Sequence, residues 1–142
     1  MVTGVEEVER RFFEAQNQHS TDAIDKVLAA NLVDHTPIPG FAADRNGLKE
    51  FFRMSFAAFP DLHNSNEDMI ISGDKVAVRF ASRGTHKGPF MGIPATGKRI
   101  TITGMATNRM AGGQIVENWV SLDLFGLLQQ LGAIPPMGPA PK

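Results

Sequence analysis

The chain has 142 residues, 42% of them hydrophobic and 20% charged, which suits one globular domain with a real core. A net charge of −1 without a basic run excludes the electrostatic footprint of a nucleic-acid-binding or membrane-surface protein. The absence of cysteine excludes disulfides and thiolate chemistry and favours a reducing compartment. With no recognisable signal peptide and no apolar run near the ~18 residues of a membrane span, we expect a cytoplasmic protein.

Residues 1–60 predict three helices. Thr3 and Glu6 form a capping box that starts the first helix. Ser20 or Thr21 caps the second helix, and Asp44 caps the third. Apolar residues at helical spacing define the buried faces: Val5, Val8, Phe12 and Phe13, then Ile24, Val27 and Leu28, then Leu48, Phe51, Phe52, Phe56 and Phe59.

After residue 60 the hydrophobic pattern changes to the period of strands, and turn residues divide it. Four strands are predicted, within residues 61–74, 75–88, 98–110 and 114–123, with a Gly/Pro loop over 88–97. A short helix follows over 124–131, and Gly132 closes it.

Helices segregated from antiparallel strands predict an α+β architecture. We expect a cone-shaped fold, in which a curved antiparallel sheet wraps around the N-terminal helices and encloses a pocket. Gly84 and Gly104, inside strand patterns, are candidate bends of the sheet. Residues 1–133 are expected to form one domain, followed by a proline-rich tail over 134–142.

Four stretches carry a resemblance to a known family: VDHTPIPG, FPDLHNSNEDMIISGDKVAVRF, GTHKGPFMGIPATGKRITITG and DLFGLLQQLGAIP. They resemble the SnoaL-like polyketide cyclases of the nuclear transport factor 2-like superfamily, over nearly the whole chain. The resemblance implies a conical pocket, chemistry without a cofactor, and often a homodimer through the outer sheet face. The founding cyclases close a ring by intramolecular aldol condensation, whereas relatives hydroxylate, isomerise, open epoxides or only bind ligands.

In the characterised cyclases an acid/base aspartate points into the cone from the last strand, and alignment of the terminal helix places Val120 at that position. Asp123 matches a second aspartate, at the junction of strand and helix. An aspartate directly before LFGLLQQL suits an N-cap. We interpret Asp123 as this cap, beside the alternative of a direct catalytic role.

If Val120 points inward, alternation puts Asn118 and Leu122 on the same face, and Trp119 on the opposite face in core or dimer packing. On the neighbouring strand the resemblance places two small residues, Gly104 and Ala106, at pocket positions, where they enlarge the cavity.

Asp34 and His35 remain as candidates for acid–base catalysis, because a histidine titrates near neutral pH and a carboxylate can orient it. Adjacent strand residues point to opposite faces, so the alternative is that Asp34 organises the turn before Pro37. His86 and Met91, on the glycine loop and its flank, complete the expected pocket lining, with His86 either bracing the loop or touching a substrate.

The four histidines lack metal-ligand spacing, so we predict no metal site. The resemblance implies that no other cofactor is needed. The first hypothesis is a cofactor-free enzyme of the polyketide cyclase or isomerase kind, acting by acid–base chemistry on a hydrophobic carbonyl compound in the pocket. The second is a non-catalytic binding protein for a hydrophobic small molecule, which Gly104, Ala106 and Val120 favour. The expected partners are this ligand and a second copy of the chain, not nucleic acid or a membrane.

Overall fold

The structure is a computed structural model that describes residues 4–135. Four helices and five strands occur within these residues: α1 (Val5–Asn17), α2 (Thr21–Val27), β1 (Leu28–Asp34), α3 (Arg45–Ala58), β2 (His63–Ser72), β3 (Lys75–Thr85), β4 (Arg99–Ala111), β5 (Gln114–Leu122) and α4 (Leu124–Leu131). Residues 136–142, most of the expected proline-rich tail, lie outside the described residues. None of the described helices is long and apolar enough to cross a membrane.

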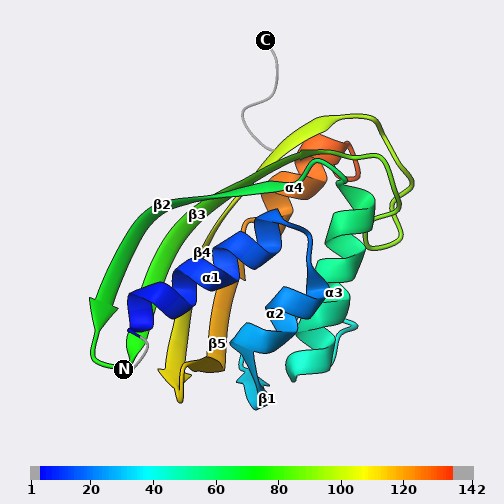
Figure 1. Ribbon diagram of the computed structural model, residues 1–142. Coiled ribbons are helices and arrows are strands. Elements are labelled where there is room, and N and C mark those ends of the chain that lie inside the picture. The colour runs from blue at the N-terminus through cyan, green and yellow to red at the C-terminus, as the bar shows by residue number, and fades with distance from the viewer. Residues whose placement is uncertain (1–3, 136–142) are drawn as a thin grey trace.

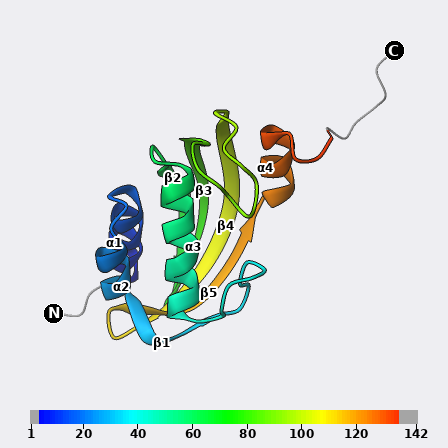
Figure 2. The same ribbon diagram turned by 90° about the vertical axis from the view of Figure 1, so that its right-hand side faces the viewer.

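The five strands form one sheet in the order β1-β5-β4-β3-β2. The sheet curves around α1 and α3, while α4 lies at one end of it (Figure 1). Figure 2 shows the three N-terminal helices together on one side of the sheet. The predicted α+β class is therefore confirmed.

One feature of the sheet differs from the prediction. Strand β1 is not among the four predicted strands, yet it pairs in parallel with β5, while the other neighbouring strands are antiparallel. The sheet is therefore mixed rather than antiparallel. The pairing joins residues more than 80 positions apart, such as Asp34 and Asn118, so local periodicity does not report it.

Side chains at the helix starts explain where two of the helices begin. The Ser20 side chain accepts a hydrogen bond from the Ala23 amide at the start of α2, and Asp44 accepts one from the Gly47 amide at the start of α3. Both predicted caps are confirmed. The N-cap of α1 is Gly4, without a side-chain hydrogen bond, and Thr3 lies outside the described residues.

The hydrophobic core consists of two clusters. One packs α1 and α2 on the sheet through Val8, Phe12, Ile24 and Ile115, and the other packs α4 and the glycine loop. Members of the second cluster include Phe59, Phe90, Ile100, Leu127 and Leu131. Each fully buried large apolar side chain stabilises the fold by about 1.5–3 kcal/mol.

Candidate functional site

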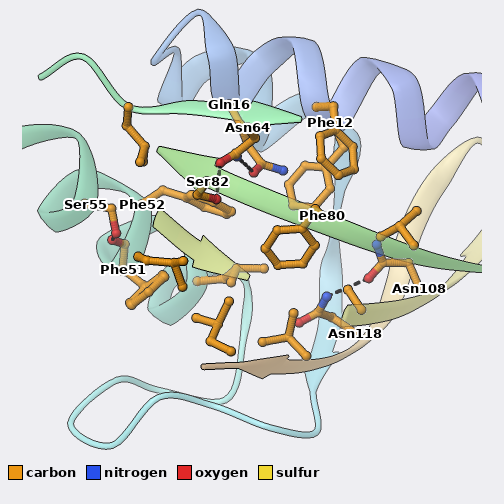
Figure 3. Close-up of a pocket in the computed structure, with 18 of the residues that line it drawn as sticks. Phe12, Gln16, Phe51, Phe52, Ser55, Asn64, Phe80, Ser82, Asn108 and Asn118 are labelled. Atoms are coloured by element: carbon orange, nitrogen blue, oxygen red, sulfur yellow. Dashed lines mark hydrogen bonds between the residues drawn. The ribbon is translucent and has the colours of Figure 1, made fainter. Parts of the chain in front are cut away.

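A cavity of about 100 Å³ lies between the concave face of the sheet and helices α1 and α3, lined by residues of both core clusters (Figure 3). Its wall is mainly aromatic: Phe12, Phe13, Phe51, Phe52, Phe59, Phe80 and Phe90. Drug-sized ligands occupy ~300–1,000 Å³, so a cavity of this volume suits a small ring. The rings of Phe51, Phe52 and Phe80 in this wall are half-buried.

Three buried polar side chains form a hydrogen-bonded chain at this cavity. The Asn118 Nδ2 group donates to Asn108 Oδ1 over 2.6 Å, and Asn108 Nδ2 donates to Glu9 Oε1 over 2.7 Å. Strands β4 and β5 pair Asn108 directly opposite Asn118, so both side chains share the inner face of the sheet. Glu9 reaches them from α1, and the three side chains are 0%, 1% and 3% exposed for Glu9, Asn108 and Asn118.

Two oxygens of these three side chains, Glu9 Oε2 and Asn118 Oδ1, have no hydrogen-bond partner within residues 4–135. A buried polar group without a partner costs about 1–3 kcal/mol, and native proteins keep few of them. Both residues line the cavity. The two oxygens are therefore the atoms at which a bound molecule gains most by offering a hydrogen-bond donor.

Burial raises the pKa of Glu9 from 4.5 to about 7, although the hydrogen bond from Asn108 acts in the opposite direction. Ionising a carboxyl among phenylalanine rings is unfavourable because the charge loses its hydration. A carboxyl with a pKa near neutrality both accepts and returns protons under physiological conditions. Glu9 therefore has the environment of an acid–base group.

A second polar cluster lines the same cavity. Asn64 donates to Gln16 Oε1, and Ser82 Oγ donates to Asn64 Oδ1 (Figure 3). Gln16 lies seven residues after Glu9 on α1, which places it about two turns, or ~10 Å, further along the same helix face. The cavity thus presents polar groups at two separate places along an aromatic wall.

Four of the predicted lining residues line the cavity: Asn118, Val120 and Leu122 on β5, and Ala106 on β4. Gly104 does not. A Cβ atom on Gly104 would lie 2.6 Å from Cζ of Phe80 and 2.9 Å from the Ser121 carbonyl oxygen. The space that the glycine leaves is therefore filled by the Phe80 ring rather than added to the cavity.

The other two predicted lining residues, His86 and Met91, also lie away from the cavity lining. His86 is fully buried, its Nδ1 accepts a hydrogen bond from the Thr96 amide over 3.2 Å, and its ring packs on Phe59. This geometry braces the glycine loop. Met91 is 40% exposed and has a φ of 50°, which places it at a strained turn of that loop.

Asp34 and His35 do not line the cavity either, and they are not brought together. Asp34 is buried on the inner face opposite Asn118, and burial raises the pKa of its carboxyl. That carboxyl accepts a hydrogen bond from the Thr36 amide over 2.9 Å, which is the turn-organising geometry. The His35 ring instead stacks on Trp119 at 4.4 Å.

The His35 ring belongs to a polar network on the other face of the sheet. Its Nε2 atom lies 3.0 Å from Oε1 of Glu117, which also forms an ion pair with Arg109. The Lys75 ammonium lies 5.6 Å from the centre of the Trp119 ring. Asp34 and His35 thus project to opposite faces of the sheet. His35 contacts Glu117 and Trp119 on the outer face instead of the cavity.

Asp123 is the N-cap of α4, and its Oδ1 atom accepts a hydrogen bond from the Gly126 amide over 2.9 Å. The side chain is exposed and does not line the cavity. We expect Asp123→Ala to lower the free energy of unfolding by about 1 kcal/mol, measured by urea denaturation, without altering turnover. A loss of turnover at unchanged stability would instead assign Asp123 to the chemistry.

Sequence reasoning missed Glu9, Asn108 and the second polar cluster. Glu9 follows Val5 by four residues and precedes Phe12 by three, so it lies on the apolar face of α1. A charged residue on the buried face of an amphipathic helix is the signal that was available. Within residues 4–135, no group of three or more histidine, aspartate or glutamate side chains is arranged to hold a metal ion.

Comparisons with known proteins agree with this fold. The chain is similar to AclR of Streptomyces galilaeus, a candidate hydroxylase, with a TM-score of 0.84 and 25% identity over 94% of this chain and 84% of that one. It is similar to TsrD of Streptomyces laurentii, with a TM-score of 0.82 and 28% identity over 92% and 96%. A third structure, IdmH of Streptomyces antibioticus, a candidate polyketide cyclase, has a TM-score of 0.80 and 32% identity over 92% and 99%.

Comparison with curated proteins finds no match. The family model described as SnoaL-like polyketide cyclase matches residues 6–131, which include every helix and strand from α1 to α4 apart from the first residue of α1. The chain therefore belongs to the SnoaL-like polyketide cyclase family.

Proposed function

We propose that the protein is an enzyme that removes a proton next to the carbonyl group of a hydrophobic compound bound in the cavity, without a cofactor. The observation that carries this proposal is the Glu9 carboxyl, fully buried in an aromatic cavity with a pKa raised to about 7. A base is most effective when its pKa lies near the working pH. The family membership and the description of IdmH as a candidate polyketide cyclase support the same reaction class.

The reaction begins with transfer of the α-proton to Glu9 Oε2, the oxygen that has no partner among the described residues. The carbon–hydrogen bond breaks, an oxygen–hydrogen bond forms on Glu9, and the electron pair moves to the carbonyl oxygen as an enolate. The enolate carbon then attacks a second carbonyl of the same compound, which closes a ring. Glu9 returns its proton to the new alkoxide. Proton transfer by a positioned carboxyl contributes about 10²–10⁴-fold to such a rate.

The carboxyl enters the cavity from a different element than in the cyclases that the sequence resembles. The position of their strand aspartate is Val120, which lines the cavity as an apolar wall. Glu9 projects from α1 onto the inner face of the sheet, where Asn108 holds one of its oxygens. The cavity thus retains a carboxyl, supplied by the first helix instead of the last strand.

A non-catalytic binding protein is the second candidate function. The aromatic wall and Val120 favour it, because an apolar cavity gives affinity without needing a reaction. The internal bonding of Gln16, Asn64 and Ser82 also leaves few groups that demand a polar ligand.

Deuterium exchange separates the two functions. Cyclohexanone and 2-indanone serve as probes, with their α-protons followed by NMR in D₂O and their binding by calorimetry. The enzyme is supported if the α-protons exchange faster than in buffer alone and the exchange rate saturates at the ketone concentrations that saturate binding. Saturable binding with exchange at the buffer rate, for both ketones, supports the binding protein and refutes the proposed enzyme.

We also propose that the protein forms a homodimer through the outer face of the sheet. Ile70, Ala77, Thr107 and Trp119 form a row across four strands, and Ile70 is 64% exposed. Met105 on the same sheet is 58% exposed. Aromatic residues and methionine, here Trp119 and Met105, are enriched in interface cores.

Sedimentation at micromolar concentration is expected to give twice the 15.4 kDa of one chain, and Ile70→Glu is expected to shift the species toward one chain. A wild-type species of 15.4 kDa would refute the dimer.

A further inference from the structure

The hydrogen bonds that link Asn118, Asn108 and Glu9 are all donated in the same direction. Hydrogens are donated from Asn118 to Asn108 and from Asn108 to Glu9. An ionised carboxylate only accepts hydrogen bonds, so Asn108 must turn its NH₂ group toward Glu9 and its oxygen toward Asn118. Asn118 then donates to Asn108, its own oxygen has no partner within residues 4–135, and the residue lines the cavity.

A protonated Glu9 permits the opposite direction. Its O–H group can donate to Asn108 Oδ1, and Asn108 Nδ2 can then donate to Asn118 Oδ1. Asn118 would present its NH₂ group to the cavity. Both reversals are half-turns about the terminal side-chain torsion of asparagine, which is broad, and the reversed amide occupies the same space. The packing around Asn108 and Asn118, which are almost fully buried, therefore permits both directions.

We propose that Asn118 is the group that selects and holds the substrate oxygen, and that its cavity-facing atom follows the proton on Glu9. With Glu9 ionised, Asn118 presents an oxygen, which accepts a hydrogen bond from a hydroxyl group. With Glu9 protonated, Asn118 presents an NH₂ group, which donates to a carbonyl or enolate oxygen. Asn108 is the positioning residue that connects Glu9 to Asn118.

The consequence for catalysis rests on the proposed function. When the α-proton has moved to Glu9, the negative charge lies on the enolate oxygen. A half-turn of the Glu9 carboxyl then brings its Oε2–H group to Asn108 in place of Oε1. Donation from this group to Asn108 reverses Asn108 and Asn118 and brings an N–H donor to the cavity. The donor is thus available to the charged intermediate rather than to the ground state, and only stabilisation of this kind accelerates a reaction.

We call the hydrogen-bonded chain of Glu9, Asn108 and Asn118 the relay. Among residues 4–135, Glu9 is the only buried acid that a helix contributes. Asp34 lies opposite Asn118 on the inner face, bound to the Thr36 amide. Arg109 and Glu117 neighbour Asn108 and Asn118 along their strands but pair with each other on the outer face. The remaining titratable side chains on α1, α2, β2 and β3 are exposed or half-buried: Glu6, Glu7, Arg10, Arg11, Glu14, Asp22, Asp25, Lys26, His63, Glu67, Asp68, Lys75, Arg79 and Arg83.

The test compares a hydroxyl ligand with a carbonyl ligand of similar size. Binding of phenol and of cyclohexanone is measured by calorimetry at about pH 5.5 and about pH 8.5, on either side of the pKa of Glu9. Phenol, like the tyrosine side chain, stays neutral below about pH 10. We expect phenol to bind up to about tenfold more tightly at the higher pH, and cyclohexanone to show the opposite trend.

Asn118→Leu and Asn108→Leu identify the group responsible. Both substitutions are expected to remove the two opposite trends, because the first removes the amide at the cavity and the second disconnects it from Glu9. Asp34→Asn is the matched control, and it is expected to keep both trends. Trends that survive in Asn118→Leu would show that Glu9 contacts the ligands alone and would overturn the proposal.

A measurement on the wild type covers the case in which a leucine variant does not fold. The side-chain ¹⁵N–¹H resonances of Asn118 are expected to shift with the same midpoint as the ¹³C carboxyl resonance of Glu9. Asn118 resonances that stay constant while Glu9 titrates would overturn the relay. If phenol and cyclohexanone show the opposite pH dependences of binding but the ketones show no catalysed deuterium exchange, the proposed enzyme is refuted and the relay is supported. If exchange is catalysed but the two pH dependences are absent, the relay is refuted and the proposed enzyme is supported.

Discussion

Between pH 4.5 and pH 7 the unfolding free energy is expected to fall by about 3 kcal/mol on account of Glu9 alone. In the unfolded chain this carboxyl releases its proton near its ordinary pKa of 4.5, whereas the folded protein holds the proton up to about 7. The folded state therefore binds more protons within this window, so stability falls as the pH rises. The contribution of Glu9 is complete below pH 4.5 and is lost once the pH passes 7.

Glu9→Gln isolates this contribution, because glutamine has a similar shape and does not titrate. Urea denaturation of both proteins across this pH range gives the difference directly. The comparison is needed because burial also raises the pKa of Asp34, while hydrogen bonds lower the pKa values of Asp61 and Glu117. Glu14→Gln, on the exposed face of the same helix, should behave as the wild type. Parallel stability curves for wild type and Glu9→Gln would mean that Glu9 titrates normally.

Turnover of the ketone probes is expected to fall by about 10²–10⁴-fold in Glu9→Gln, with ligand binding largely retained. Glutamine preserves the volume of the side chain in the cavity but cannot take a proton from carbon. The wild-type rate should rise with pH through about 7, as Glu9 becomes ionised, and the residual rate of the variant should lack this rise. Exchange rates by NMR and dissociation constants by calorimetry separate the loss of chemistry from a loss of binding.

Glu14→Gln is again the matched control, and its exchange rate should equal that of the wild type. Full activity in Glu9→Gln would exclude Glu9 as the base and direct attention to Asp34 and His35. A loss of activity in His35→Ala, beside an active Glu9→Gln, would move the chemistry to the face of the sheet where His35 stacks on Trp119.

In the proposed mechanism, the catalytic carboxyl does not have to lie at the strand position that the resemblance assigns to Val120. Residues of the sheet and of the helices both line the cavity, so an acid–base group can enter it from either side. Figure 2 shows the helices on one side of the sheet. What the chemistry requires is an apolar surrounding that raises the pKa and a donor that orients the carboxyl. At Glu9 the phenylalanine wall provides the first and Asn108 provides the second.

Local patterns in the sequence determined the order of the helices and the four long strands, together with the caps at Ser20 and Asp44. These features depend on residues a few positions apart, because helix and strand periods and capping hydrogen bonds are short-range. The same reasoning applies to the alternation along β5, which points Asn118, Val120 and Leu122 toward the cavity.

The tertiary structure alone decided which polar residues meet and how their charges behave. Glu9 and Asn108 are 99 positions apart, and β1 pairs with a strand from the other end of the chain. Close approach also decided that Phe80 fills the space beside Gly104. The raised pKa of Glu9 arises from burial by side chains of several helices and strands, because desolvation is a property of the packed surroundings and not of the residue or its sequence neighbours.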